Sequence, residues 1–352
     1  MNSEFYQRLS ELNWKAPSDW VGIRTIDAHT EGEPLRVILA GFPELTGTTI
    51  LERRRQAKEH YDNLRRSLMW EPRGHADMYG CLITPPVSET GDFGVLFLHN
   101  EGYSTMCGHG IIAVTKVAVE IGLIEPEGAE TAVRIDTPAG LVTAYARMQN
   151  NSVRSVYFHN VPSFVLALDE TVEVPGLGSI RYDLAFGGAF YAYVNAEDAG
   201  VRCVAEDYRL LIERGMAIKH TVMKNYDIHH PFEPDLNFLY GTIFIGPAED
   251  PTNSSRNVCI FAEGEVDRCP TGTGVSARMA IHHARGEIAV GEKPMIIESL
   301  IGSNFKAGVL SETTFGSHKA VIPEVEGTAH ITGIHQFVID PEDPLRNGFI
   351  LR

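Results

Sequence analysis

The chain has 352 residues, of which 43% are hydrophobic, so it can bury one large or two ordinary cores. The 30 Lys and Arg residues against 46 Asp and Glu residues give a formal charge of −16, which argues against a nucleic-acid partner. An anionic small molecule stays open as a ligand, because backbone donors in a pocket hold an anion whatever the net charge.

The N-terminus and the cysteines indicate the compartment. The opening MNSEFYQRLSELNW carries charges where a signal peptide needs an apolar run, so export is not expected. Apolar runs all stay well short of the ~18 residues of a membrane span. The five cysteines form no CxxC pair and are odd in number, which argues against a disulfide scaffold and a structural zinc site. We therefore expect a cytoplasmic protein with free thiols.

In chain order, residues 1–20 are a polar lead-in, and strand-like runs alternate with turns from Val21 onward. The charged segment 51–68 predicts a solvated surface helix. Segment 203–225 predicts a second helix with one charged face. The chain is thus expected to combine many short strands with few helices.

The most informative pattern is an internal repeat with an offset of 164 residues, which places Cys107 against Thr271. Each copy predicts a strand that runs into a glycine-rich turn, a helix that begins at the turn, and a glycine that ends the helix. The coinciding positions are Gly108 with Gly272, Gly110 with Gly274, Gly122 with Gly286, and Leu96-Phe97 with Ile260-Phe261. Two such units would bring two helix N-termini to one cleft.

The two predicted helices are Ile111–Ile121, which is apolar nearly all round, and Val275–Arg285, which is apolar on one side. We expect the first to be buried. A first helical turn leaves backbone N–H groups unpaired and carries a partial positive charge, and glycines there let a ligand approach closely.

The turns Cys107–Gly110 and Thr271–Gly274 are therefore predicted to form two anion-binding cradles. Either turn alone is more typical of an ordinary tight turn into a helix, but two copies in register favour the cradle. A cysteine at such a place is expected to have a lowered pKa, which suits a nucleophile or a general base. His109 lies too near along the chain to be the usual base for Cys107, so we favour a general base.

The remaining polar and glycine-rich patterns indicate neither a cofactor nor a metal. Two adjacent histidine pairs lack the i,i+4 spacing that puts two ligands on one helix face, and no glycine run has a nucleotide-loop pattern. Three further cysteines are expected to be buried small hydrophobes. These features are His229-His230, His282-His283, Gly187-Gly188, Cys81, Cys203 and Cys259.

Six segments together point to one family. They are DAHTEGEP (27–34), EPRGHADMYG (71–80), NEGYSTMCGHG (100–110), AFGGAFYAYV (185–194), VDRCPTGTG (266–274) and DPLRNGF (343–349). The chain resembles the proline racemase family, which includes hydroxyproline epimerases and 3-hydroxyproline dehydratases.

The resemblance implies an α+β fold like that of diaminopimelate epimerase, with two pseudo-symmetric domains, each with strands wrapped around a central helix. The expected domains are 21–160 with 338–352, which holds Cys107, and 161–337, which holds Thr271. The active site is expected in the cleft between them.

The second catalytic position distinguishes members of this family. Its racemases use two cysteines, one on each face of the substrate Cα, and the first falls at Cys107. The second belongs to a Pro-Cys-Gly motif, which here is Pro270-Thr271-Gly272. Cys269 precedes the proline and matches Thr105 in the repeat, so it is not expected to share the geometry. A Cys/Thr pair resembles the trans-3-hydroxy-L-proline dehydratases.

Stereochemistry independently favours one base. In trans-3-hydroxy-L-proline the 3-hydroxyl lies on the same ring face as the Cα hydrogen, so loss of water is syn. We expect Cys107 to remove the Cα proton, with its thiol a candidate donor to the leaving hydroxide, and Thr271 only to donate a hydrogen bond and fill space. The enamine product would tautomerise to Δ1-pyrroline-2-carboxylate.

The expected substrate contacts follow from the cradles and the family. Asp267 and His109 should bind the ring nitrogen, as the family's acidic position does. The backbone donors expected to hold the carboxylate are those of Gly108, His109, Gly272 and Thr273.

Two other functions stay open. One is a two-base racemase or epimerase of proline or hydroxyproline, which a second thiol reaching the site, Cys269 included, would favour. The other is a non-catalytic binding protein for small amino acids, against which a low-pKa Cys107 argues. A hydroxylated proline is the expected ligand, without a nucleic-acid or membrane partner, and a homodimer is a candidate assembly.

Overall fold

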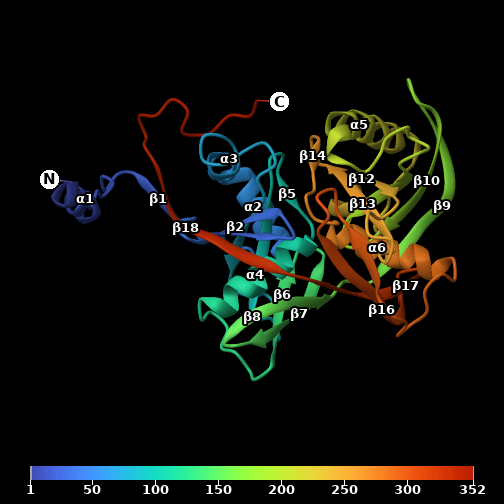
Figure 1. Ribbon diagram of the computed structural model, residues 1–352, viewed down its shortest axis with the longest axis horizontal. Coiled ribbons are helices and arrows are strands. Elements are labelled where there is room, and N and C mark those ends of the chain that lie inside the picture. The colour runs from blue at the N-terminus through green and yellow to red at the C-terminus, as the bar shows by residue number, and fades with distance from the viewer. Residues whose placement is uncertain (1, 352) are drawn as a thin grey trace.

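A computed structural model of the chain describes residues 2–351, whose strands and helices gather into two lobes around two central helices (Figure 1). We call them the α4 lobe and the α6 lobe. Helix α1 (Asn2–Glu11) precedes both and extends away from them. The α4 lobe contains β1 (Val21–Thr30), β2 (Glu33–Ala40), α2 (Ile50–His60), α3 (Asp62–Met69), β3 (Gly80–Thr84), β4 (Phe93–Leu98), β5 (Tyr103–Ser104), α4 (Gly108–Glu120), β6 (Glu130–Thr137), β7 (Gly140–Gln149), β8 (Ser152–His159) and β18 (Ala329–Ile339).

The α6 lobe is formed by the intervening chain. Its elements are β9 (Ser163–Val174), β10 (Gly178–Phe186), β11 (Phe190–Asn195), the 3-10 helix η1 (Ala205–Asp207), α5 (Tyr208–Asn225), the 3-10 helix η2 (Pro234–Leu236), β12 (Leu239–Gly246), β13 (Ser255–Phe261), β14 (Glu265–Val266), α6 (Gly272–Ala284), β15 (Met295–Glu298), β16 (Asn304–Phe315) and β17 (His318–Gly327). The predicted α+β class is confirmed.

The strand pairing shows that the internal repeat is structural. In the α4 lobe β2 pairs parallel with β3, β3 antiparallel with β4, β4 parallel with β6, and β6 antiparallel with β7. In the α6 lobe β11, β12, β13, β15 and β16 follow the same order of parallel and antiparallel pairs. Helices α4 and α6 therefore leave equivalent points of two similar sheets.

The repeat extends to one buried carboxylate in each lobe. Asp136, on β6, accepts the N–H groups of Val87 and Ser88 at 2.7 and 3.0 Å. Glu298, on β15, accepts those of Glu249 and Asp250 at 2.7 and 2.9 Å. Both carboxylates thus hold the loop that precedes the central strand of their lobe.

The two lobes are joined through their strands. Strand β8 of the α4 lobe pairs antiparallel with β17 of the α6 lobe, and β18, which follows β17 along the chain, pairs antiparallel with β1 in the α4 lobe. Within residues 2–351, all 18 strands are linked into one continuous sheet. The domain boundaries expected from the sequence stay a prediction.

The central helices form as the sequence predicts. Helix α4 packs against β1, β2, β7, β8 and β18, and α6 packs against β9, β10, β16 and β17. Gly122 and Gly286, just past the two helices, have φ of 75° and 72°, which is the left-handed conformation expected at a helix end. The predicted burial of α4 is confirmed, since its residues from Gly108 to Thr115 are all buried.

One expectation about the outer helices is corrected. Residues 1–20 include α1, and segment 51–68 forms two helices, α2 and α3, instead of one solvated helix. Arg53 and Arg65 on these helices are buried, because their guanidinium groups bind backbone carbonyls of neighbouring loops, as in Arg65 Nη1 to His99 O at 2.8 Å. In the described part of the chain, the helices all lack the length and apolar character that crossing a membrane requires.

Candidate active site

The N-termini of α4 and α6 meet through a pair of glycines. A Cβ atom on Gly108 would lie 2.5 Å from the Cα of Gly272, and one on Gly272 would lie 2.7 Å from the Cα of Gly108. Any larger residue would separate the two helix ends. The close contact aims the unpaired first-turn N–H groups of both helices at one point, where an anion is favoured.

Cys107 is the N-cap of α4, with φ −147° and ψ 107°. Its Sγ accepts a hydrogen bond from the N–H of Gly110 at 3.2 Å, and the side chain is buried. Burial raises the pKa of the thiol well above its ordinary value, while the Gly110 N–H and the Tyr79 hydroxyl oppose the rise and the Asp267 charge adds to it. The expected lowered pKa is therefore wrong for this conformation, because the thiol loses more hydration than the helix terminus replaces.

His109 stands beside the thiol. Its Nδ1 lies 3.2 Å from Cys107 Sγ and its Nε2 lies 3.6 Å away. The two side chains are therefore in contact, and the expectation that His109 is not the usual base for Cys107 stays a prediction. Burial lowers the pKa of His109 to about 4, so the ring is neutral at neutral pH.

Thr271 occupies the equivalent place on α6 but in another conformation. Its φ of 68° is unusual for a β-branched residue, and its side chain makes no cap hydrogen bond. The hydroxyl instead donates to Asp267 Oδ2 at 2.8 Å. Asp267 Oδ1 accepts the N–H of Cys269 at 2.8 Å, so this carboxylate orders the turn into α6.

Cys269 lies at the margin of the site. Its Sγ accepts the N–H of Thr271 at 3.3 Å. The donor atoms of His109, Asp267 and Cys269 all lie within 4.8 Å of one another, a grouping of nitrogen, oxygen and sulfur of the kind that zinc prefers. Burial raises the pKa of the Cys269 thiol, and both Asp267 oxygens already accept hydrogen bonds, so the group is not prepared for a cation.

A small cavity brings the predicted site residues together. All seven predicted positions line it, and Cys269 does not. Its free volume is only about 10 Å³, which is room for roughly one water molecule and not for a proline ring. The lining residues are Tyr79, Met106, Cys107, Gly108, His109, Tyr191, Tyr240, Phe261, Asp267, Thr271, Gly272 and Thr273.

A larger space leads toward this cavity. It has a volume of about 770 Å³, and Tyr240 borders both. Its charged rim comes from both lobes and includes Arg54, Lys58, Glu101, Lys219 and Glu263. Both lobes contribute residues to the lining of both spaces.

Sequence reasoning missed the aromatic walls of the site. Tyr79 lies in the EPRGHADMYG segment and Tyr191 in the AFGGAFYAYV segment, so both are in family-like motifs. Their hydroxyl groups contact Ser104 Oγ at 2.5 Å and Thr273 Oγ1 at 2.7 Å. The signal available in the sequence was a tyrosine within each motif, because its ring suits a buried wall and its hydroxyl can reach a polar site.

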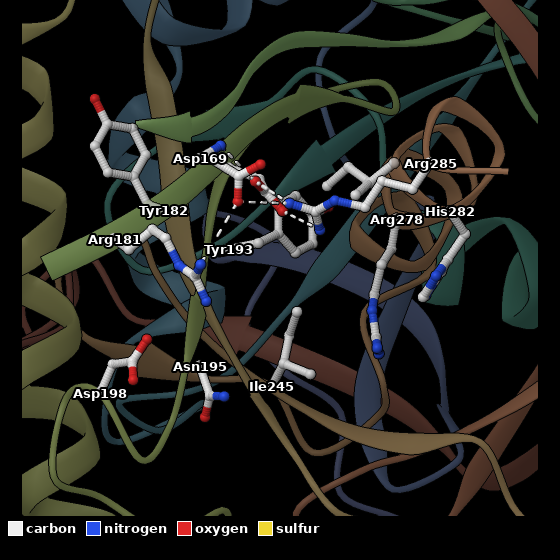
Figure 2. A pocket seen from close by; sticks show the side chains of 12 residues that line it. Asp169, Arg181, Tyr182, Tyr193, Asn195, Asp198, Ile245, Arg278, His282 and Arg285 are labelled. Carbon is white, nitrogen blue, oxygen red and sulfur yellow. Dashed lines mark hydrogen bonds and ion pairs between the residues drawn. The ribbon is translucent and has the colours of Figure 1, made fainter. Parts of the chain in front are cut away.

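Another cavity, of about 240 Å³, lies at the C-terminal end of α6 and contains none of the predicted site residues (Figure 2). Arg285 forms ion pairs there with Asp169 and Asp183 at 3.1 and 2.9 Å. Arg278 instead binds Asn257 Oδ1 at 2.8 Å, and the Asn257 amide donates to the carbonyl of Pro270. This region therefore supports the turn that carries Thr271.

Comparisons with known proteins agree with this geometry. The family model for proline racemase matches residues 25–350. A trans-3-hydroxy-L-proline dehydratase from Colwellia psychrerythraea is 49% identical over 333 residues, which cover 95% of this chain and 94% of the relative. A 3-hydroxyproline 2-epimerase from Burkholderia multivorans is 45% identical over 330 residues, with coverage of 94% and 98%. The crystal structure of a hydroxyproline epimerase from Agrobacterium vitis with bound trans-4-hydroxy-L-proline has a TM-score of 0.90 at 34% identity, with coverage of 95% and 96%.

Proposed function

Because this chain belongs to the proline racemase family, we propose that it is a hydro-lyase that converts trans-3-hydroxy-L-proline to Δ1-pyrroline-2-carboxylate. The observation that carries the proposal is the asymmetry of the cavity, which has the Cys107 thiol at one helix N-terminus and the Thr271 hydroxyl at the other. A threonine hydroxyl is too weak an acid to exchange a proton as a thiol does. One base on one face suits a syn elimination.

Substrate binding uses the helix ends. The carboxylate accepts hydrogen bonds from the first-turn N–H groups of Gly108 and His109 on α4 and of Gly272 and Thr273 on α6. The ring ammonium pairs with Asp267, next to His109. The charge of Asp267 otherwise adds to the rise that burial causes in the Cys107 pKa, so binding of the ammonium favours the thiolate.

Catalysis then follows on the Cys107 face. The thiolate, formed by loss of the thiol proton to solvent, removes the Cα proton. The C3–O bond breaks on the same face, and the resulting enamine tautomerises to the pyrroline. In this mechanism Cys107 acts as the base and no cofactor takes part. The five free, buried cysteines support a reducing compartment such as the cytoplasm.

An epimerase is the second candidate. The observation that favours it is the position of Cys269, whose Sγ lies within 4.8 Å of the His109 and Asp267 donor atoms, where a shift of the turn could bring it to the second face. A relative named 3-hydroxyproline 2-epimerase has a similar level of identity.

One experiment separates these functions. The purified protein is incubated in D2O with L-proline and with the 3- and 4-hydroxyproline isomers. A dehydratase forms pyrroline from trans-3-hydroxy-L-proline, an epimerase forms the Cα epimer with deuterium incorporated, and a binding protein does neither. Asp267→Asn should raise KM by loss of the charge pair with the ammonium, and an unchanged KM and kcat would show that Asp267 does not contact the substrate.

A further inference from the structure

The tyrosine hydroxyl groups that border the cavity come from both lobes. Tyr191 contacts Thr273 Oγ1 at 2.7 Å, on the α6 side. Tyr79 belongs to the α4 lobe, and its ring lies 4.8 Å from the His109 ring, measured between centroids. Its hydroxyl contacts Ser104 Oγ at 2.5 Å and the Tyr240 hydroxyl at 3.3 Å. Tyr79 therefore shares the wall that carries Cys107.

The dehydration needs a proton donor on this wall. In trans-3-hydroxy-L-proline the departing oxygen is on the ring face of the Cα hydrogen, which is the face that Cys107 approaches. Hydroxide leaves slowly unless a positioned acid protonates it as the C–O bond breaks. We propose that Tyr79 is the residue that donates this proton to the departing 3-hydroxyl group, and that the Cys107 thiol then returns a proton to Tyr79. This inference rests on the proposed dehydratase function.

The reaction needs no acid or base other than Cys107 and Tyr79. The Cα–H bond breaks, its proton goes to Cys107 Sγ, and its electron pair forms the C2=C3 bond. The C3–O bond breaks with its electron pair on oxygen, which takes the Tyr79 proton and leaves as water. The phenolate then takes the proton held by Cys107, and both side chains return to their initial states.

The surroundings of Tyr79 suit this role. Burial raises the pKa of its hydroxyl, as does the nearby Cys107, so the phenol is protonated when the reaction begins. Ser104 and Tyr240 lower that pKa through hydrogen bonds, which they can also donate to a transient phenolate. His109 is a poorer donor, because burial lowers its pKa to about 4 and a neutral imidazole N–H is a weaker acid than a phenol.

The test compares two leaving groups in Tyr79→Phe. Chloride leaves without a proton, so trans-3-chloro-L-proline needs no acid, whereas trans-3-hydroxy-L-proline does. We expect the variant to lose at least about 10²-fold in pyrroline formation from the hydroxy substrate, the scale of a lost general acid, and only a few-fold from the chloro substrate. Tyr191→Phe is the matched control, because it removes a hydroxyl from the α6 side of the cavity and should leave the ratio of the two rates unchanged.

A second measurement keeps the test independent of the chloro compound. In D2O, Tyr79→Phe should return hydroxyproline with deuterium at Cα, because proton removal continues while C–O cleavage is slow. Equal losses for both substrates, or equal losses of exchange and elimination, would overturn the role of Tyr79. If the unmodified protein forms no pyrroline from either substrate, the dehydratase function itself fails, which is a distinguishable result.

Discussion

The N-termini of α4 and α6 occupy equivalent places in the repeat, yet their cap residues are held in different ways. Cys107 is extended, and its Sγ accepts a hydrogen bond from its own helix. Thr271 has a φ of 68°, its side chain makes no cap hydrogen bond to its helix, and its hydroxyl donates to Asp267. The glycines that follow, Gly108 and Gly272, contact each other almost symmetrically. A symmetric backbone therefore carries two differently held caps, and the proposed chemistry on one face depends on that difference.

The comparison is tested most strongly by removing each cap side chain. Cys107→Ala should lower turnover by at least ~10²-fold, because it deletes the general base, and Cys107→Ser should be nearly as damaging because a hydroxyl is a poor base. Thr271→Val, which keeps the shape and removes the hydrogen bond to Asp267, should cost far less. Pyrroline formation from trans-3-hydroxy-L-proline is the measurement. Substantial dehydration by either Cys107 variant would refute its assignment as the base.

The glycine pair should respond symmetrically. In Gly108→Ala and in Gly272→Ala the new Cβ meets the opposing Cα at 2.5 or 2.7 Å, so the helix ends must separate. Overpacking of this kind costs roughly 1–3 kcal/mol, and we expect each variant to lose about one to two powers of ten in kcat/KM, mainly through KM. Gly102→Ala is the control, since nothing lies within 4 Å of its added Cβ. Loss in only one of the two variants would show that a single helix end binds the carboxylate.

The sequence allowed the symmetric part of this site to be predicted. Periodicity and glycine spacing located α4 and α6, their ends at Gly122 and Gly286, and the convergence of Cys107 and Thr271 on one cavity. These features depend on local residue patterns and on the offset between two copies. A repeat in the sequence thus carried directly into a repeat in the fold.

The asymmetric part depends on tertiary packing that local patterns do not encode. Thr271 has a positive φ and is bonded to Asp267, and the raised pKa of Cys107 follows from its burial. Tyr79 reaches the cavity only because β3 and β4 place its loop against α4. Arg65 is buried although its segment is charged, because distant carbonyl groups bind it.

The two lobes also differ in how strongly their buried carboxylates, Asp136 and Glu298, are expected to stabilise the fold. Burial opposes ionisation of Glu298, yet the Glu249 and Asp250 N–H groups, Asn253 and Arg256 together lower its pKa to about 2. Because this value is below that of the unfolded chain, the stabilisation is present above pH ~4.5 and is lost as the pH falls toward 2. Glu298→Gln should therefore lower the free energy of unfolding by about 2 kcal/mol at pH 7 and by much less near pH 3.

Asp136→Asn is the matched variant in the α4 lobe. Asp136 accepts the same two backbone bonds, but its cross-strand neighbour is Gly94, where Glu298 has Arg256. Urea unfolding of both variants at the two pH values should show the smaller loss for Asp136→Asn. Equal losses at pH 7 would mean that Arg256 adds no net stability to the α6 lobe.

The smallest expected effect concerns Cys269. Its thiol accepts the N–H of Thr271 at 3.3 Å, and Cys269 does not line the cavity. Cys269→Ala should therefore keep dehydratase activity within a few-fold. Cys81→Ala, which empties a similar volume in β3, is the control for a general loss of packing.

Thr271→Cys completes this test from the other side. It places a thiol at the position that faces Cys107 and should create measurable epimerisation of 4-hydroxyproline, because a second acid can then deliver a proton to the opposite face of Cα. One variant removes a thiol from the turn at 267–271, and the other adds a thiol to it. If Cys269→Ala abolishes activity while Cys81→Ala does not, Cys269 reaches the substrate and a two-thiol isomerase becomes the better assignment, because Thr271 then no longer marks the second catalytic position.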